Sequence, residues 1–320
     1  MRMLATAACL SLLAAAAFAD PLPSWNAGET KSAIIGFVEA VTDPASDEYV
    51  TPADRIAVFD NDGTLWSEQP AYFQLFFAID HVKKMDESQL TSDALKAAAA
   101  GDMKALMATG EQGLLEVLAA SHTGMSVAAF KDSVASWLDM AVHPTTGMRY
   151  DAMVYQPMLE LLSFLRDEGF ATYIVSGGGI DFIRVFSGGA YNIPVSQVVG
   201  SSLVSDYVVE NGTPMLMKTP DLFFLDDKAG KPVAINHHIG KRPIFAAGNS
   251  DGDFQMLEWT TSGEAPSFGL YVHHTDDDRE WAYDREGHIG VLNRGLDDGP
   301  ERGWYFADMA KDWAVIWPAE

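Results

Sequence analysis

Cysteine is almost absent from this sequence. The only one, Cys9, lies in the N-terminal apolar run, so the rest of the chain can form no intramolecular disulfide and must be stabilised by a packed core. Basic residues are also scarce, with 21 lysines and arginines against 45 acidic residues and a formal net charge of −24. Such a chain repels phosphate backbones and anionic lipids, which argues against nucleic-acid or membrane-surface binding.

Long hydrophobic runs are equally rare, and the clearest one is at the N-terminus. It follows a short basic start, is rich in Leu and Ala, and ends at Ala17-Phe18-Ala19. These features are typical of a secretory signal peptide, and the run is short for a membrane-spanning helix. We therefore expect residues 1–19 to be removed, leaving a periplasmic protein with no stable membrane association.

The most informative stretch joins an apolar run to two acids. Residues 56–59 have the character of a strand buried in a parallel sheet, and Asp-Asn-Asp-Gly-Thr follows at 60–64. Ligands of open α/β sheets bind at the carboxyl ends of strands, and alternate strand residues point the same way, so Asp60 and Asp62 would face one site. Because adjacent carboxylates repel, the pair predicts a bound metal or a nucleophile working with an acid.

Two further apolar runs end in polar residues. Residues 171–175 lead into Ser176 and three glycines, including Gly177, whose backbone N–H groups could approach an anion where a helix begins. Residues 243–247 lead into Gly-Asn-Ser-Asp-Gly-Asp at 248–253. The same edge of the sheet is therefore expected to carry all three polar segments.

In this order, the segments resemble the motifs of the haloacid dehalogenase-like (HAD) superfamily, whose phosphatases carry Asp-x-Asp-x-Thr in motif one. Residues 248–257 resemble the Gly-Asp-x-x-Asn-Asp-x-x-Met-Leu signature of the phosphoserine-phosphatase-like branch. In this alignment the first acid of the signature is Asn249 and the last is Asp253. An amide oxygen can ligate Mg²⁺ but carries no charge, so the sequence leaves open whether Asn249 or Asp251 contacts the ion.

Motif three of the superfamily is a lysine that precedes motif four, and three lysines are candidates. Lys231 lies 22 residues before Asp253 and precedes Pro232, which could open a helix. Lys228 lies in an acidic loop that we expect to be solvated, and Lys241 lies at the base of the motif-four strand. We prefer Lys231 and leave the other two open.

The resemblance implies a Mg²⁺-dependent phosphomonoesterase that acts on a small organic phosphate. Asp60 would attack phosphorus to form an aspartyl-phosphate, and Asp62 would protonate the leaving oxygen and then activate water. The phosphoryl oxygens would be held by Ser176, Lys231 and the backbone of Gly177, and Mg²⁺ by Asp60, Asp62, Asn249 and Asp253. Because a halide leaving group needs no proton, Asp62 favours phosphoryl chemistry over dehalogenation.

Two alternatives remain open at this point. A phosphotransferase would pass the phosphoryl group from Asp60 to an alcohol instead of water. A non-catalytic periplasmic protein would keep the fold and bind a phosphate ester or a cation, and the missing charge at Asn249 would suit it. Retention of both Asp60 and Asp62 speaks against a binding protein.

The expected fold is α/β, with a Rossmann-like three-layer parallel sheet and a helical cap inserted after the first catalytic strand. The core would comprise residues 20–65 and 150–320, and the cap residues 66–149, where only helical patterns occur. Such caps exclude water and select substrates. Glu68 and Arg149 lie at the two ends of the cap and are candidate substrate contacts.

Several local features are also predicted. We expect helices over 30–41, 91–108, 111–121 and 126–141, the last with Ser126 as its N-cap, and a helix opened by Pro70. Asn211-Gly212 predicts a β-hairpin between residues 204–209 and 214–218. The histidines lack zinc-site spacings, and among them His274 is a candidate proton donor on the substrate side.

Overall fold

The computed structural model of the protein describes residues 19–319. The predicted signal peptide, apart from Ala19, lies outside these residues. Within 19–319 no helix combines the length and the apolar character needed to span a membrane.

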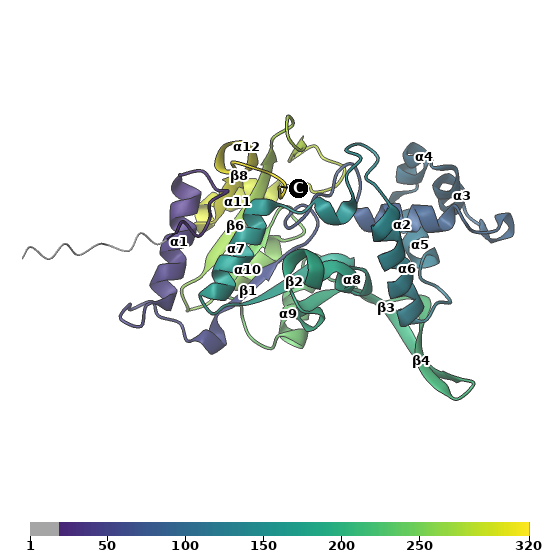
Figure 1. Ribbon diagram of the computed structural model, residues 1–320, viewed down its shortest axis with the longest axis horizontal. Helices are drawn as coiled ribbons and strands as arrows, with labels where there is room; N and C mark the ends of the chain where they lie inside the picture. Colours follow the sequence, from purple (N-terminus) through teal and green to yellow (C-terminus); the bar gives the residue numbers. More distant parts are fainter. Residues whose placement is uncertain (1–18, 320) are drawn as a thin grey trace, which may run out of the picture.

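A single sheet organises the described part of the chain (Figure 1). Strands β3, β2, β1, β5, β6 and β8 lie side by side and run parallel, while β4 and β7 add antiparallel edges to β3 and β6. The strands are β1 Ile56–Phe59, β2 Ala171–Gly179, β3 Val198–Glu210, β4 Thr213–Phe224, β5 Phe245–Gly248, β6 Phe268–Thr275, β7 Ala282–Tyr283 and β8 Tyr305–Asp308.

Helices cover both faces of this sheet. They are α1 Glu29–Thr42, α2 Phe73–Val82, α3 Asp93–Ala100, α4 Met103–Ala108, α5 Gly110–Ala120, α6 Val127–Met140, α7 Gln156–Asp167, α8 Ile180–Tyr191, α9 Gly230–His238, α10 Phe254–Thr261, α11 Arg294–Asp298 and α12 Met309–Asp312.

Strand β1 shows why the core has three layers. All four of its residues are buried, as expected for a strand inside a parallel sheet. Ala57 and Phe59 pack into the hydrophobic cluster that contains α1, α7 and α8, whereas Ile56 and Val58 pack into a second cluster with α9 and α10. Alternate side chains therefore enter opposite layers, and the predicted Rossmann-like α/β fold is confirmed.

Helices α2 to α6 follow β1 and precede β2, so they lie in the stretch predicted to form a cap. Figure 1 shows them grouped at one end of the molecule, with α1 at the other. Helices α2 to α5 share a hydrophobic cluster of their own, separate from the two clusters of the sheet. The β3–β4 hairpin reaches this group, because Lys218 of β4 exchanges backbone hydrogen bonds with Gly124 and Met125.

Local predictions are mostly confirmed, with two differences. Ser126 accepts the N–H of Ala129 as N-cap of α6, and the hairpin turns at Asn211 and Gly212, both with positive φ. The helix predicted over 91–108 is divided into α3 and α4, because Gly101 adopts a left-handed φ of 69° and stops α3. The helix after Pro70 begins three residues later, at Phe73.

Candidate active site

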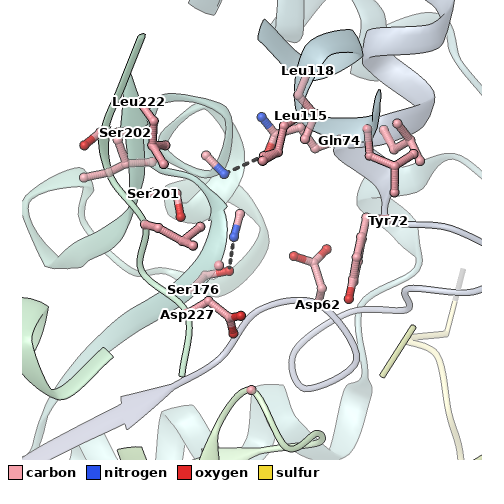
Figure 2. Close-up of a pocket in the computed structure, with 18 of the residues that line it drawn as sticks. Asp62, Tyr72, Gln74, Leu115, Leu118, Ser176, Ser201, Ser202, Leu222 and Asp227 are labelled. Carbon is pink, nitrogen blue, oxygen red and sulfur yellow. Dashed lines mark hydrogen bonds between the residues drawn. The ribbon is translucent and has the colours of Figure 1, made fainter. Parts of the chain in front are cut away.

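The carboxyl ends of β1 and β2 meet at a cavity of about 310 Å³ (Figure 2). Seven residues predicted for the site line this cavity: Asp60, Asp62, Glu68, Ser176, Gly177, Lys231 and Asp253. They come from segments far apart in the sequence and converge because parallel strands end at the same edge of the sheet. Asn249, at the end of β5, is buried beside them.

Lys231 forms the centre of the charged end of the cavity. Its Nζ lies 2.8 Å from Asp60 Oδ1 and 2.6 Å from Asp253 Oδ1, and it also donates to the carbonyl of Val175 at 2.9 Å. Burial alone would lower the pKa of Lys231, but the charges of Asp253 and Asp60 outweigh burial and raise it. The lysine is therefore a permanent cation held against the predicted nucleophile.

Both carboxylate oxygens of Asp253 already accept hydrogen bonds. Its Oδ1 receives Lys231, and its Oδ2 accepts the backbone N–H groups of Asn249 and Ser250 at 3.0 and 3.1 Å. These bonds give Asp253 a structural task, and its role as a metal ligand stays a prediction. Asp253 orients the lysine and the loop after β5.

Asp251, the alternative ligand at motif four, does not line the cavity. Its carboxylate accepts backbone N–H groups of Asn293, Arg294 and Gly295, at 2.9–3.1 Å, where α11 begins. Of the two residues left open by the sequence, Asn249 is the one placed at the site.

Asp60 is buried, and its carboxylate charge is only partly balanced by neighbouring groups. Its Oδ1 is ion-paired with Lys231 but accepts no well-directed hydrogen bond. Burial, together with the charge of Asp253, raises the pKa of Asp60 to about 8 despite the opposing effect of Lys231. A carboxylate nucleophile has to be ionised, so this position calls for additional positive charge.

Asp62 lies on the same side of the cavity. Its Oδ1 accepts the indole N–H of Trp66 at 2.8 Å, and burial raises its pKa. A Cβ placed on Gly178 would lie 3.3 Å from Asp62 Oδ2, so the carboxyl group faces the glycine segment that follows Ser176. A raised pKa in this position is suited to a proton donor.

Asn249 is joined to Glu68, 181 residues earlier in the chain. Its Nδ2 donates to Glu68 Oε1 at 2.6 Å, and the same oxygen accepts the hydroxyl of Tyr283 at 2.8 Å. Burial, aided by the charges of Asp62 and Asp60, raises the pKa of Glu68. Glu68 thus supplies a carboxyl group next to the amide that stands where the family signature has an acid.

The oxygen atoms of the site fit a Mg²⁺ ion. Asp60 Oδ1 lacks a directed donor, and Asn249 Oδ1 receives only a 3.3 Å bond from Thr64. Carboxylate and amide oxygens are the ligands that hard divalent cations prefer. Among residues 19–319, no three His, Cys, Asp or Glu side chains form a metal cluster by themselves, so an ion here would also need the amide and backbone oxygens.

The segment after β2 offers donors at the other side of the cavity. Ser176 is fully buried, and its Oγ accepts the N–H of Gly178 at 3.1 Å. The N–H of Gly179 donates to Gln74 Oε1 of α2 at 2.7 Å. Gly177 is exposed to the cavity, and α8 begins directly afterwards at Ile180. The segment is therefore held between the sheet and the helices of the predicted cap.

Arg149 is not brought to the cavity. Its guanidinium pairs with Asp151 at 2.6 Å and donates to the carbonyl of Asp139, on the surface. The two alternative lysines are also elsewhere: Lys228 is exposed, and Lys241 pairs with Asp54 at 2.7 Å. Lys231 is the candidate lysine that contacts Asp60.

His274 supports the motif-one loop from behind and is not a substrate-side group. It is buried, with Nε2 bonded to the carbonyl of Gly63 at 2.7 Å and Nδ1 to Glu280 Oε2 at 3.2 Å. Glu280 also accepts hydrogen bonds from Tyr155 and Ser67. Because both ring nitrogens of His274 already form hydrogen bonds, His274 is not the substrate-side proton donor that the sequence suggested.

Other residues at the cavity were not found from the sequence. Lys218, Asp181 and His122 line its far part, and they come from β4, α8 and the end of α5. Asp226, in the loop expected to be solvated, precedes the lining residue Asp227; it is fully buried, and burial raises its pKa to about 7. No local pattern distinguishes these residues, because only packing of distant elements brings them together.

Comparison with known proteins agrees with this geometry. The family model of haloacid dehalogenase-like hydrolases matches residues 57–258. No curated protein sequence matches the chain. A conserved, functionally unknown protein from Anaerococcus prevotii has a similar fold, with 16% identity, a TM-score of 0.53, and coverage of 81% of this chain and 89% of that one.

A phosphoserine phosphohydrolase-like protein from Francisella tularensis is also similar, with 17% identity, a TM-score of 0.38, and coverage of 77% of this chain and 98% of that one. The extent of the family match confirms the resemblance inferred from the motifs. The chain belongs to the haloacid dehalogenase-like hydrolases.

Proposed function

We propose that this protein is a phosphomonoesterase that uses Asp60 as its nucleophile. The observation that carries the proposal is the buried pairing of Asp60 with Lys231, next to Asp62, at the carboxyl ends of the parallel strands. A binding site needs no carboxyl group of raised pKa beside a second carboxylate, whereas a two-step phosphoryl transfer uses both.

In the first step, Asp60 attacks phosphorus and the bond from phosphorus to the ester oxygen breaks. Asp62 gives its proton to that oxygen, which leaves as an alcohol. In the second step, Asp62 takes a proton from water, whose oxygen attacks the phosphorus carried by Asp60. The bond from phosphorus to Asp60 then breaks, and inorganic phosphate leaves.

Ser176, the backbone of Gly177 and Lys231 are positioned to hold the phosphoryl oxygens. The charge on these oxygens changes along the reaction, so fixed donors stabilise the transition state more than the bound ester. Loss of one such donor reduces kcat by about 100- to 1,000-fold in comparable sites. Asp253 acts through Lys231, because it holds the ammonium group in place.

Mg²⁺ would be held by Asp60, Asn249 and the backbone oxygen of Asp62. When bound, it would supply positive charge that keeps Asp60 ionised and offsets the negative charge of the phosphoryl group. Glu68, hydrogen-bonded to Asn249, would add a carboxyl group at the edge of this site.

We also propose that the protein is periplasmic, that residues 1–19 are a signal peptide and that residues 66–149 form a cap.

The test is hydrolysis of p-nitrophenyl phosphate by residues 20–320, with and without Mg²⁺, beside Asp60→Asn. We expect metal-dependent turnover that disappears in the variant. If nitrophenolate release exceeds phosphate release when glycerol is added, the protein is a phosphotransferase. If no ester turns over with any divalent metal, the phosphatase proposal is wrong and a binding protein becomes the better reading.

A further inference from the structure

The wall of the cavity opposite Asp60 is built from leucines. Leu114, Leu115 and Leu118 come from α5, Leu75 comes from α2, and Leu203 and Leu222 come from the β3–β4 hairpin. Figure 2 shows Leu115 and Leu118 on one side and Leu222 on the other, with Asp62 and Ser176 at the opposite end. A group attached to a phosphoryl at Asp60 would extend toward these side chains.

Two of these leucines remain partly exposed. Leu115 is 42% and Leu222 48% exposed, although both line the cavity. Apolar side chains that face a cavity from two separate elements gain free energy when a ligand covers them. Their exposure at the mouth therefore favours an apolar ligand.

No free cation is available at this wall. Among the described residues that line the cavity, the basic side chains besides His122 are Lys231, at the nucleophile, and Lys218. Lys218 is almost completely buried and pairs with Asp181 at 2.5 Å, so its charge is already balanced. Burial lowers the pKa of His122 to about 4, which leaves its ring neutral. A carboxylate or second phosphate would therefore find no free cationic partner among these lining residues.

The far part of the cavity also lacks the groups that would bind a cationic ligand. Asp181, the acid at the far part of the cavity, is committed to Lys218. Among the described lining residues, Tyr72 supplies the one tyrosine, phenylalanine or tryptophan ring, whereas cation recognition by aromatic faces uses several rings. The acids near Asp60 lie at the phosphoryl end, where Lys231 pairs with Asp60 and Asp253 and a metal ion would add further positive charge.

We infer that the substrate is a phosphate monoester of an uncharged, apolar alcohol whose hydrocarbon part packs against the leucine wall. This inference rests on the proposed phosphatase function. The reaction is hydrolysis, in which water supplies the oxygen of phosphate and the two hydrogens that end on phosphate and alcohol. No further reactant is needed.

The experiment compares ethyl, butyl and hexyl phosphate, whose leaving groups differ in length but little in chemical reactivity. We expect kcat/KM to rise by up to about fourfold for each methylene that the leucine wall buries. A flat or falling series would overturn the inference. So would a preference for 6-aminohexyl phosphate over hexyl phosphate, because that would assign the wall to a cation.

A matched pair of variants assigns the effect to this wall. Leu222 and Leu216 both lie on β4 and are 48% and 49% exposed, but only Leu222 lines the cavity. Leu222→Asn should reduce the hexyl-to-ethyl ratio of kcat/KM at least about fivefold, and Leu216→Asn should leave that ratio and both rates unchanged. Equal ratios in the two variants would overturn the assignment.

Binding of ethyl-, butyl- and hexylphosphonate, measured by calorimetry with Mg²⁺, separates the two proposals. These compounds carry a non-hydrolysable carbon–phosphorus bond, so their affinity does not depend on turnover. Affinity that rises with chain length supports the apolar wall even if no ester is hydrolysed. Equal affinities with measurable hydrolysis would keep the phosphatase and overturn the substrate class.

Discussion

Asn249 donates a hydrogen bond to Glu68 at 2.6 Å, so that an amide and a carboxyl group share the place next to the nucleophile. Both side chains are buried, and a Cβ on Gly63 would collide with either of them. The neutral amide is therefore compatible with Glu68, whereas two carboxylates in this space would repel each other without a cation.

Asn249→Asp should make the protein more dependent on metal. Without a divalent ion, the added charge beside Glu68 should lower the free energy of unfolding by about 3 kcal/mol. With Mg²⁺, the extra ligand charge should tighten binding about tenfold or more. Urea unfolding with chelator and calorimetry with Mg²⁺ measure the two effects.

Asn211→Asp, in the exposed turn of the hairpin, is the matched control and should change neither quantity. If Asn249→Asp left Mg²⁺ affinity unchanged, Asn249 would not be a ligand.

Asp60→Asn should abolish turnover and stabilise the metal-free protein at alkaline pH. The pKa of Asp60 is about 8 in the folded protein against an ordinary value of 3.8, so the folded state holds its proton more tightly. Stability from this group is therefore complete near pH 4 and falls as the pH rises to about 8. One pKa unit corresponds to about 1.4 kcal/mol.

Urea unfolding of both proteins with chelator measures this difference. The variant should be the more stable of the two at pH 8 and match the wild type near pH 4. A variant that is less stable at pH 8 would show that the pair with Lys231 outweighs the cost of burying the carboxylate.

Asp62→Asn should reduce activity according to the leaving group. An alkyl alcohol leaves slowly without a proton, so the rate on ethyl phosphate should fall by about 100- to 10,000-fold. The rate on p-nitrophenyl phosphate should fall far less, because nitrophenolate leaves as an anion. Steady-state kinetics on both esters make the comparison, and equal losses would remove Asp62 from the role of acid.

Glu280→Gln should destabilise the fold by about 3–5 kcal/mol. Although burial acts to raise it, the pKa of Glu280 is lowered by its hydrogen bond and charge interaction with His274, so the group is a buried carboxylate. Its loss leaves His274, which supports the carbonyl of Gly63, without the carboxylate that its Nδ1 contacts. Urea unfolding at neutral pH measures the change.

Glu264→Gln, at an exposed position, serves as the control and should be neutral. Because a lowered pKa stabilises the protein only while the carboxylate is ionised, the difference between Glu280→Gln and the wild type should shrink as the pH falls below the ordinary value of 4.5. A constant difference would point to packing as its cause.

Local sequence patterns determined where the strands, turns and polar segments lie. The apolar run before Asp60 forms a buried strand, Ser126 caps its helix, and Asn211-Gly212 turns the hairpin. These features depend on backbone preferences and on the pattern of apolar and polar residues over a short stretch. A single sequence displays both directly. The order of the motifs was enough to identify the family.

The tertiary structure alone decided which polar groups meet. Asp251 and Asn249 are two residues apart, yet Asp251 caps α11 while Asn249 binds Glu68. Arg149 is the last residue of the predicted cap, but it pairs on the surface with Asp151. The leucine wall likewise joins α5 to a hairpin about a hundred residues later in the chain. Such contacts depend on how whole elements pack, and no local periodicity carries that information.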